Sequence, residues 1–490
     1  MRKRQRSRLG RLPRHSQGEA VAAAIADGDR LAAAGRFAAA AACFEHALAR
    51  ASDDAVTLGK LAYALAAGGR MPEAVTRYEE ALRLAPDNPA LHANLGILLR
   101  ATGRTVEARA RISRALEIDP NHANALYHMA DVLSKLGQDD EARAYYRRAV
   151  SRYRRVLAGR RGAADDYVKL GNAHLALAMV DHALDCYRSA LARAPDHALA
   201  RSRIGLALTR AGRYADAILC FRRVLAAEPD DVEARRTLAQ LLRELGRFEP
   251  AARVFRKVLR QRPEDATARY FLAAIERRDM PEAPPEGYVE TLFDGYADIF
   301  DMHLVDVLGY RAPWLMHEVV EEEIGRGAGT WTVMDLGCGT GLCGPLFRAY
   351  AKRLIGVDKS RRMIEKARER GVYDDLHVAD LGDALAAYDE GLDLIVAADV
   401  LIYIGNLAPV FAAVRHALKR GGWLAFTTET AETKTFTLDV SGRYGHSSRY
   451  IRTLADAHGL ALIRHDKAVI RQQSGKPISG TLYVMRRTGD

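Results

Sequence analysis

The sequence predicts a multidomain chain, in which an all-α solenoid of helical hairpins precedes an α/β domain with a mostly parallel, seven-stranded sheet. Two observations predict this architecture. A pattern with a period of 34 residues runs through the first half of the chain, and strand-like segments alternate with helix-like ones after residue 288. Between them, Arg277–Gly287 (RRDMPEAPPEG) holds three prolines and no apolar periodicity, which marks a domain boundary. We expect a basic disordered tail over 1–18, seven repeats with a capping helix over 19–276, a proline-rich linker over 277–288 and the α/β domain over 289–490.

The repeating pattern combines three positions. A Gly-Arg pair or its equivalent marks each turn, an alanine follows five residues later, and a large side chain follows four residues after the alanine. Glycine turns the chain because it adopts positive φ at low cost, and the small alanine lets two antiparallel helices approach under the large side chain. In the seven units these positions are Gly35, Gly69, Gly103, Gly137, Ala178, Gly212 and Gly246; Ala40, Ala74, Ala108, Ala142, Ala183, Ala217 and Ala251; and Phe44, Tyr78, Ile112, Tyr146, Tyr187, Phe221 and Phe255.

This register resembles that of the tetratricopeptide repeat over about Glu19–Arg262, with Thr267–Arg278 as a lone helix that caps the stack. One interval is 41 residues instead of 34, and its seven extra residues predict a lengthened second helix in the fourth unit. The resemblance implies a concave surface that binds an extended protein or peptide partner and performs no chemistry.

Charge and cysteine usage narrow the partners and the compartment. Of the net charge of +11, seven positive charges lie in Met1–Gln17, and seven arginines cluster between Arg147 and Arg161. Such clusters can bind nucleic acid, but solvated tails and helix faces explain them as well, so nucleic acid stays an alternative partner. No apolar run is long enough for a membrane span, and we expect no membrane partner. Five cysteines without metal-ligand spacing predict reduced thiols, no metal and a cytoplasmic location.

The α/β domain is predicted from apolar runs separated by helical segments. Strands separated in this way form a parallel sheet with helices on both faces, and ligands lie beyond the carboxyl ends of its strands. The expected helices are Leu342–Ala351, Arg361–Arg370 and Pro409–Leu418, and the expected strands are Thr332–Leu336, Leu354–Asp358, His377–Leu381, Leu394–Ala398, Trp423–Thr427, Leu460–Ile470 and Gly480–Met485.

A glycine-rich loop follows the first of these strands, in the stretch Asp335–Gly341 (DLGCGTG). Its glycines let the loop pass close under a ligand, with N–H groups of the next helix directed at it. Asp358 ends the second strand, where a carboxylate can accept both ribose hydroxyls. The pattern Gly339-x-Gly341-x-x-Gly344 also fits a dinucleotide-binding fold. Asp335 favours another ligand, since its carboxylate repels a pyrophosphate and suits an ammonium group.

The whole stretch resembles motif I of the Rossmann-like class I S-adenosylmethionine-dependent methyltransferases. Four later segments resemble further motifs of this family in order: Val357–Ser360 with Met363-Ile364, Ala379–Leu381, Asp393–Leu401, and Leu418–Leu424. The resemblance implies S-adenosylmethionine as the cofactor, bound by Asp335, Gly337, Cys338, Gly339, Gly341, Asp358, Lys359, Met363, Asp380, Leu381, Ala398 and Asp399. With its repeats, the chain resembles the bacterial tetratricopeptide-repeat methyltransferases.

Two flanking segments are candidates for the rest of the pocket. Tyr288–Leu304 resembles the helical lid of many small-molecule methyltransferases, in which Tyr296 and Phe300 either cover the cofactor or pack in the core. The stretch Arg443–His446 follows the fifth strand, on the acceptor side. There we expect His446 as a general base, with Tyr444 as a second catalytic candidate; a plain surface loop is the alternative.

The predicted activity is methyl transfer, which needs mainly alignment of the acceptor with the methyl group. No Asn/Asp-Pro-Pro-Tyr/Phe signature follows the fourth strand, no cysteine follows it as a nucleophile, and Asp399 has no downstream Asp-Asn partner for a magnesium site. These absences leave O-, N- or C-methylation of a small molecule, or of a protein or carrier-bound group recruited by the repeats. The alternatives are an RNA-directed methyltransferase and a repeat scaffold with an inactive methyltransferase fold.

Overall fold

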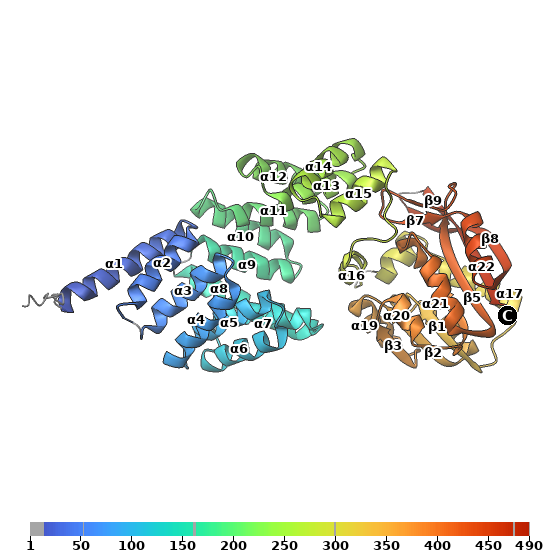
Figure 1. Ribbon diagram of the computed structural model, residues 1–490, viewed down its shortest axis with the longest axis horizontal. Helices are drawn as coiled ribbons and strands as arrows, with labels where there is room; N and C mark the ends of the chain where they lie inside the picture. The colour runs from blue at the N-terminus through green and yellow to red at the C-terminus, as the bar shows by residue number, and fades with distance from the viewer. Residues whose placement is uncertain (1–13, 52, 160–162, 298–299, 474–475, 490) are drawn as a thin grey trace, which may run out of the picture. The chain divides into compact units, whose positions relative to one another are not determined.

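The computed structural model describes residues 14–51, 53–159, 163–297, 300–473 and 476–489, and it divides into two compact units, Met1–Cys220 and Phe221–Asp490. The first unit consists of antiparallel helix pairs (Figure 1). Its first helix starts at Arg14, inside the segment expected to be a disordered tail; Met1–Pro13 lies outside the described residues. Its helices are α1 (Arg14–Ala33), α2 (Phe37–Leu48), α3 (Ala55–Ala67), α4 (Met71–Leu84), α5 (Pro89–Ala101), α6 (Thr105–Ile118), α7 (Ala123–Lys135), α8 (Asp139–Ala158), α9 (Ala164–Ala176), α10 (Val180–Arg193), α11 (Ala198–Arg210) and the start of α12 (Tyr214–Ala227).

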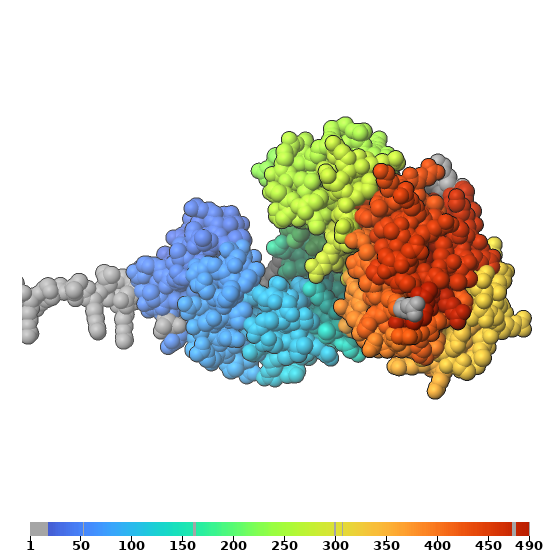
Figure 2. Space-filling model, turned by 45° about the vertical axis from the view of Figure 1, so that its right-hand side comes forward, coloured from blue at the N-terminus to red at the C-terminus, as the bar shows by residue number. Residues whose placement is uncertain are grey.

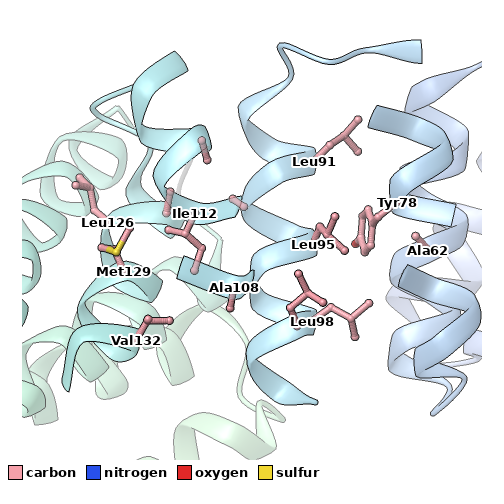
Figure 3. Close-up of a cluster of buried hydrophobic side chains, with 14 of the residues drawn as sticks. Ala62, Tyr78, Leu91, Leu95, Leu98, Ala108, Ile112, Leu126, Met129 and Val132 are labelled. Carbon is pink, nitrogen blue, oxygen red and sulfur yellow. The ribbon is translucent and has the colours of Figure 1, made fainter. Parts of the chain in front are cut away.

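The hairpins follow the period that the sequence predicts. All seven turn residues have positive φ, and Ala178, the one turn residue that is not glycine, has φ of 58°. The alanines and large side chains of the pattern are buried, and Figure 3 shows Tyr78, Ile112 and Ala108 between neighbouring helices. A Cβ atom at Gly96 would lie 2.5 Å from Ile112 Cγ1, so glycine is needed where the first helix of a pair meets the large residue of the second.

The lengthened helix expected in the fourth unit is α8, which has 20 residues where α4 and α6 have 14. Two arginines of its basic cluster bind the preceding turn: Arg148 donates to the Pro120 carbonyl at 3.0 Å and Arg152 to the Asn121 carbonyl at 3.0 Å. Arg160 and Arg161 lie outside the described residues. At least two members of the cluster therefore brace the repeat stack.

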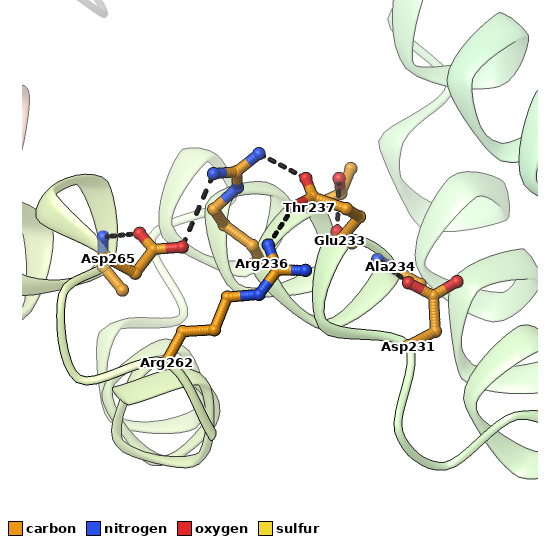
Figure 4. Close-up of polar contacts among 8 residues, drawn as sticks. Asp231, Glu233, Ala234, Arg236, Thr237, Arg262 and Asp265 are labelled. Carbon is orange, nitrogen blue, oxygen red and sulfur yellow. Dashed lines mark hydrogen bonds and ion pairs between the residues drawn. The ribbon is translucent and has the colours of Figure 1, made fainter. Parts of the chain in front are cut away.

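The second unit begins inside α12 and continues with the end of the repeats, α13 (Val232–Glu244), α14 (Phe248–Gln261) and α15 (Ala266–Glu276). Figure 4 shows how polar side chains hold these helices together. Glu233 pairs with Arg236 and with Arg262, the latter at 2.8 Å. Asp265 caps α15 by accepting from the Ala268 N–H at 2.8 Å, an arrangement that stabilises a helix by about 1 kcal/mol.

A mixed sheet with helices on both faces forms the rest of the second unit, which is coloured yellow, orange and red in Figure 2. Among the described residues it has nine strands, in the order β3-β2-β1-β4-β5-β7-β6, and β9 pairs with β5 and β8. The expected seven strands are present, with β9 antiparallel to β5, but the strand expected over His377–Leu381 is β3 at Asp375–Val378. Two short additions, β6 and β7, extend the sheet. The strands are β1 (Trp331–Leu336), β2 (Ala351–Asp358), β3 (Asp375–Val378), β4 (Leu392–Ala397), β5 (Leu418–Thr430), β6 (Phe436–Leu438), β7 (Tyr444–His446), β8 (Leu460–Gln473) and β9 (Lys476–Arg487).

Helices cover both faces of this sheet because its central strands are apolar on both sides. On β1, Val333 packs on one face with α17 and α18, while Met334 packs on the other with α20, α21 and α22. The segment expected as one helix over 342–351 is shorter, because β2 already begins at Ala351. No described helix combines the length and apolarity that a membrane crossing requires. The helices are α16 (Tyr288–Asp294), the π-helix η1 (Met302–Val307), α17 (Ala312–Ile324), α18 (Gly344–Phe347), the 3-10 helix η2 (Arg348–Tyr350), α19 (Arg361–Glu369), α20 (Leu381–Ala386), the 3-10 helix η3 (Leu401–Tyr403), α21 (Ala408–Ala417) and α22 (Ser448–Ala457).

Candidate active site

A cavity of about 670 Å³ lies where the sheet strands end, within the second unit. It receives residues from the loops after β1, β2, β3 and β4, which is where ligands bind in parallel sheets. Eight of the twelve expected cofactor-binding residues line it: Gly337, Gly339, Asp358, Lys359, Asp380, Leu381, Ala398 and Asp399. The other four, Asp335, Cys338, Gly341 and Met363, do not.

The glycine-rich loop needs its glycines for two reasons. Gly337 and Gly339 have φ of 71° and 54°, in the left-handed region that favours glycine. A Cβ atom at Gly337 would lie 2.3 Å from Val400 Cγ2, on the loop after β4. The loop therefore brings bare backbone to the cavity, as a closely bound ligand requires.

Two carboxylates mark the neighbouring strand ends. Asp358, at the end of β2, accepts from the Gly339 N–H at 3.0 Å and from the Ser360 N–H at 2.8 Å. Burial raises the pKa of Asp358, although these two N–H groups oppose the shift. Asp380, after β3, pairs with Lys359 at 3.0 Å. Burial opposes its ionisation, but Lys359 and the Gly382 N–H outweigh burial and lower the pKa of Asp380.

Asp335 differs from its expected placement and role. Its side chain is buried and accepts a hydrogen bond from the Tyr373 hydroxyl at 2.6 Å, and burial raises its pKa to about 7. Side chains alternate along a strand, so Asp335 shares the covered face of Val333 instead of facing the cavity. Cβ atoms at Gly341 and Gly344 would lie 2.9 and 2.8 Å from the Tyr373 ring. These two glycines therefore make room for Tyr373, and the expected contact of Asp335 with an ammonium group is corrected.

The remaining non-lining residues have packing positions. Cys338 is buried with Ile364 and Ala367 of α19, and burial raises the pKa of its thiol well above the ordinary value. Met363 is fully buried in the same helix. Both support the loop and the helix behind the cavity.

The candidate lid, the segment before the sheet, lies against the glycine-rich loop. Tyr296 and Phe300 both line the cavity, with ring centroids 5.3 Å apart in an edge-on arrangement. The Phe300 ring lies 3.9 Å from the position of a Cβ atom on Gly339. Asp294 accepts from the Ser360 hydroxyl at 2.6 Å, and Asp301 pairs with Arg370. The lid is thus bound on both sides of its aromatic residues.

The two candidate catalytic residues, His446 and Tyr444, lie on β7. His446 is fully buried, with Nε2 2.9 Å from the Ile404 carbonyl, and burial lowers its pKa to about 4. Tyr444 is also fully buried and donates to the Pro281 carbonyl at 2.8 Å. Neither side chain lines the cavity, so the expected general base is corrected: both residues hold loops together.

A charged network that the sequence analysis does not predict surrounds Asp399, on the loop after β4. Arg471 of β8 is 3% exposed and pairs with both Asp399 and Glu429. Glu429 also pairs with Arg443 at 3.5 Å, and Asp399, Arg443 and Arg471 line the cavity. Burial alone would lower the pKa of Arg471, but the two carboxylates raise it. Its partners are 72 and 42 residues away along the sequence, so no local pattern predicts the network.

The proline-rich segment forms part of the cavity wall. We call Pro281–Gly287 the connector; Glu282 and the five residues after it line the cavity. The Glu282 carbonyl accepts from the Gly405 and Asn406 N–H groups at 2.8 and 3.0 Å. The connector is therefore a built element of the site.

The end of the repeats contacts the loop that carries Arg443. Tyr270 of α15 donates to the Gly442 carbonyl at 2.9 Å, and Arg243 of α13 donates to the Val440 carbonyl at 2.6 Å. The Arg243 guanidinium also lies 4.0 Å from the centroid of the Phe271 ring. Helices α13 and α15 thus hold one loop of the site.

Comparison with known families agrees with this geometry. A model described as a methyltransferase domain matches residues 334–426. Tetratricopeptide-repeat models match residues 62–103, 87–155, 121–196, 168–232 and 208–275. The chain therefore carries tetratricopeptide repeats followed by a methyltransferase domain. This result confirms the predicted resemblance and fold class, and with them S-adenosylmethionine as the cofactor of that domain.

The curated relatives each match only part of the chain. A ubiquinone biosynthesis O-methyltransferase of Thiobacillus denitrificans is 29% identical over 22% of this chain and 49% of its own length. Human methyltransferase-like protein 27 is 31% identical over 28% of this chain and 56% of its own length. The chain thus spans about half the length of these two relatives. Among solved structures, an S-adenosylmethionine-dependent methyltransferase from Mesorhizobium loti is 21% identical, with a TM-score of 0.28 over 36% of this chain and 98% of that one.

Proposed function

We propose that the protein is an S-adenosylmethionine-dependent methyltransferase whose acceptor is a small molecule or a protein- or carrier-bound group recruited by the repeats. The observation that carries this proposal is one cavity in which Gly337 and Gly339 lie beside the carboxylate of Asp358. The glycines admit a ligand close to the backbone, and the carboxylates of Asp358 and Asp380 can accept hydrogen bonds from ribose hydroxyls and a base amine. The residues present fit this cofactor.

When bound, the cofactor would supply a methyl group to a nucleophilic acceptor, and its sulfur would take up the electron pair of the broken bond. Asp358 and Asp380 would hold the nucleoside end by accepting hydrogen bonds from it. Tyr296 and Phe300 cover the loop and exclude water. The chain contributes alignment above all, because methyl transfer depends on an in-line approach of the two reacting atoms.

We further propose that a protein or peptide binds the concave face of the repeats and brings the acceptor. A stack of helical hairpins suits an extended ligand. A cytoplasmic location is part of this proposal, because all five cysteines are free thiols, as expected in a reducing compartment.

Calorimetry on the full chain tests the function. S-adenosylhomocysteine should bind with a micromolar dissociation constant, on the order of 8 kcal/mol, and a nicotinamide dinucleotide should not bind. Asp358→Asn should weaken S-adenosylhomocysteine at least about tenfold, since hydrogen bonds to a charged group contribute about 1.5–3 kcal/mol each. The matched variant Asp383→Asn, on the exposed side of α20, should bind like the unmodified protein. Binding of the dinucleotide alone would overturn the proposal, and binding of neither ligand would favour an inactive scaffold.

A further inference from the structure

One carboxylate oxygen of Asp399 accepts a hydrogen bond from Arg471, and the other has no donor among the described residues. Asp399 follows β4 and lines the cavity, and Arg471 donates to its Oδ2 atom. Its Oδ1 atom is buried, and no hydrogen-bond donor among the described residues reaches it. A buried carboxylate oxygen without a donor is costly, so such an atom on a cavity wall indicates the place where a ligand donates.

The backbone and the neighbouring charges fix this carboxylate in place. Asp399 has φ of 59°, a left-handed conformation that costs energy in any residue other than glycine and that recurs at functional sites. Its N–H donates to the Thr427 hydroxyl at 2.8 Å, which holds the strained residue against β5. Arg471 is itself held by Glu429. The Oδ1 atom of Asp399 therefore has a defined direction before any ligand binds.

The sheet order places Asp399 at the end of the cavity that lies away from the two carboxylates proposed to hold the nucleoside. The order β3-β2-β1-β4 puts Asp399 on the opposite side of β1 from Asp358 and Asp380. A nucleoside held by Asp358 and Asp380 directs its far end across β1, toward the loop after β4. Tyr296, Tyr310 and Tyr403 line the cavity as well.

We infer that Asp399 is a catalytic residue that accepts the proton of the acceptor, and that the reacting atom is an oxygen or nitrogen bearing hydrogen. This inference rests on the proposed function. An ionised carboxylate oxygen only accepts hydrogen bonds, so its partner is an O–H or N–H group. In the transfer, the heteroatom uses a lone pair to bond to the methyl carbon, and the proton it loses passes to Asp399 Oδ1 and then to solvent. A carboxylate acceptor carries no proton and is repelled by Asp399.

An acceptor-independent probe tests this placement. In the cofactor analogue sinefungin, a carbon atom stands in place of the sulfonium sulfur and carries an amine in place of the methyl group. It therefore has N–H donors where the methyl group of the cofactor would lie. By calorimetry on the full chain, sinefungin should bind at least about tenfold tighter than S-adenosylhomocysteine, through a charge-assisted hydrogen bond to Asp399. In Asp399→Asn this preference should disappear: asparagine tolerates the left-handed conformation, its oxygen can keep the bond to Arg471, and its amide then presents donors to the amine.

Asp380→Asn is the matched control, because Asp380 lies at the nucleoside end. This substitution should lower the affinities for sinefungin and S-adenosylhomocysteine by the same factor and leave the ratio of the two affinities unchanged. The inference is overturned if the unmodified protein binds both ligands equally, or if Asp399→Asn keeps the preference. The inference is also overturned if Asp399→Asn lowers the affinity for S-adenosylhomocysteine as much as the affinity for sinefungin. Asp399 would then contact the ammonium group that both ligands share with the cofactor. Failure of both ligands to bind the unmodified protein would instead refute the proposed function.

Discussion

Replacing Asp335 by asparagine should make the stability of the methyltransferase domain less sensitive to a rise in pH from acid to neutral values. The folded-state pKa is about 7, above the ordinary value of 3.8, because the carboxyl group is fully buried. The folded state therefore binds this proton more tightly than the unfolded state. The stabilisation is fully present below about pH 4 and is lost as the pH rises through 7. The asparagine side chain would have no proton to lose and would still accept the Tyr373 hydrogen bond.

The size of the effect follows from the two pKa values. At about 1.4 kcal/mol per pH unit, their difference corresponds to at most ~4 kcal/mol, or roughly 10 °C for a unit of this size. Thermal unfolding followed by tryptophan fluorescence is the suitable assay, because all three tryptophans, Trp314, Trp331 and Trp423, lie in the methyltransferase domain. The midpoint of the unmodified protein should fall between pH 5 and pH 8 by several degrees more than that of Asp335→Asn. Parallel curves across this range would refute the burial argument.

Two further predictions concern the repeats. A piece of the chain that starts at Pro229 keeps α13–α15 and should bind S-adenosylhomocysteine with an affinity within about threefold of that of the full chain. A piece that starts at Asp279 lacks Arg243 and Tyr270 and should bind it several-fold more weakly. Equal affinities of the two pieces in calorimetry would contradict a role for these contacts. Ala178→Gly should stabilise the repeats by about 0.5–1 kcal/mol in denaturant unfolding followed by circular dichroism, since glycine removes the strain at φ of 58°, and a loss of stability would show that this turn is unstrained.

The repeats and the central strands could be predicted because their signals are local or periodic. Ala178 is the clearest case, since nothing in its own chemistry indicates a left-handed turn, yet its place in the 34-residue period does. Strands β1, β2 and β4 are short apolar runs between turns. Strands β6 and β7 have three residues each, too few for any periodicity to register. Helix α22 was missed although Ser447, its N-cap, accepts from the Tyr450 N–H at 3.1 Å.

The sequence predicts those site residues whose role depends on backbone conformation. It does not predict those whose placement depends on contacts with side chains far away in the sequence. Gly337 and Gly339 were identified because a tight loop after a strand needs positive φ. The direction of Asp335 depends on Tyr373, 38 residues further on, whose ring fills the space beside the glycines. His446 is a candidate because histidine is a common base, but its side chain is fully buried on β7 and does not line the cavity. Such contacts follow from the folded chain and leave no mark in a single sequence.

A chain segment that merely joins two domains tolerates insertions, because loop closure costs little more with each added residue. The connector Pro281–Gly287 has no such freedom. Its first carbonyls are bound by the Tyr444 hydroxyl and by the Gly405 and Asn406 N–H groups, and its next residues form the cavity wall. Lengthening or shortening it would reshape the space available to the acceptor. Among descendants of one ancestral chain, substrate preference could therefore diverge through length changes in this segment while every residue that holds the cofactor stays the same.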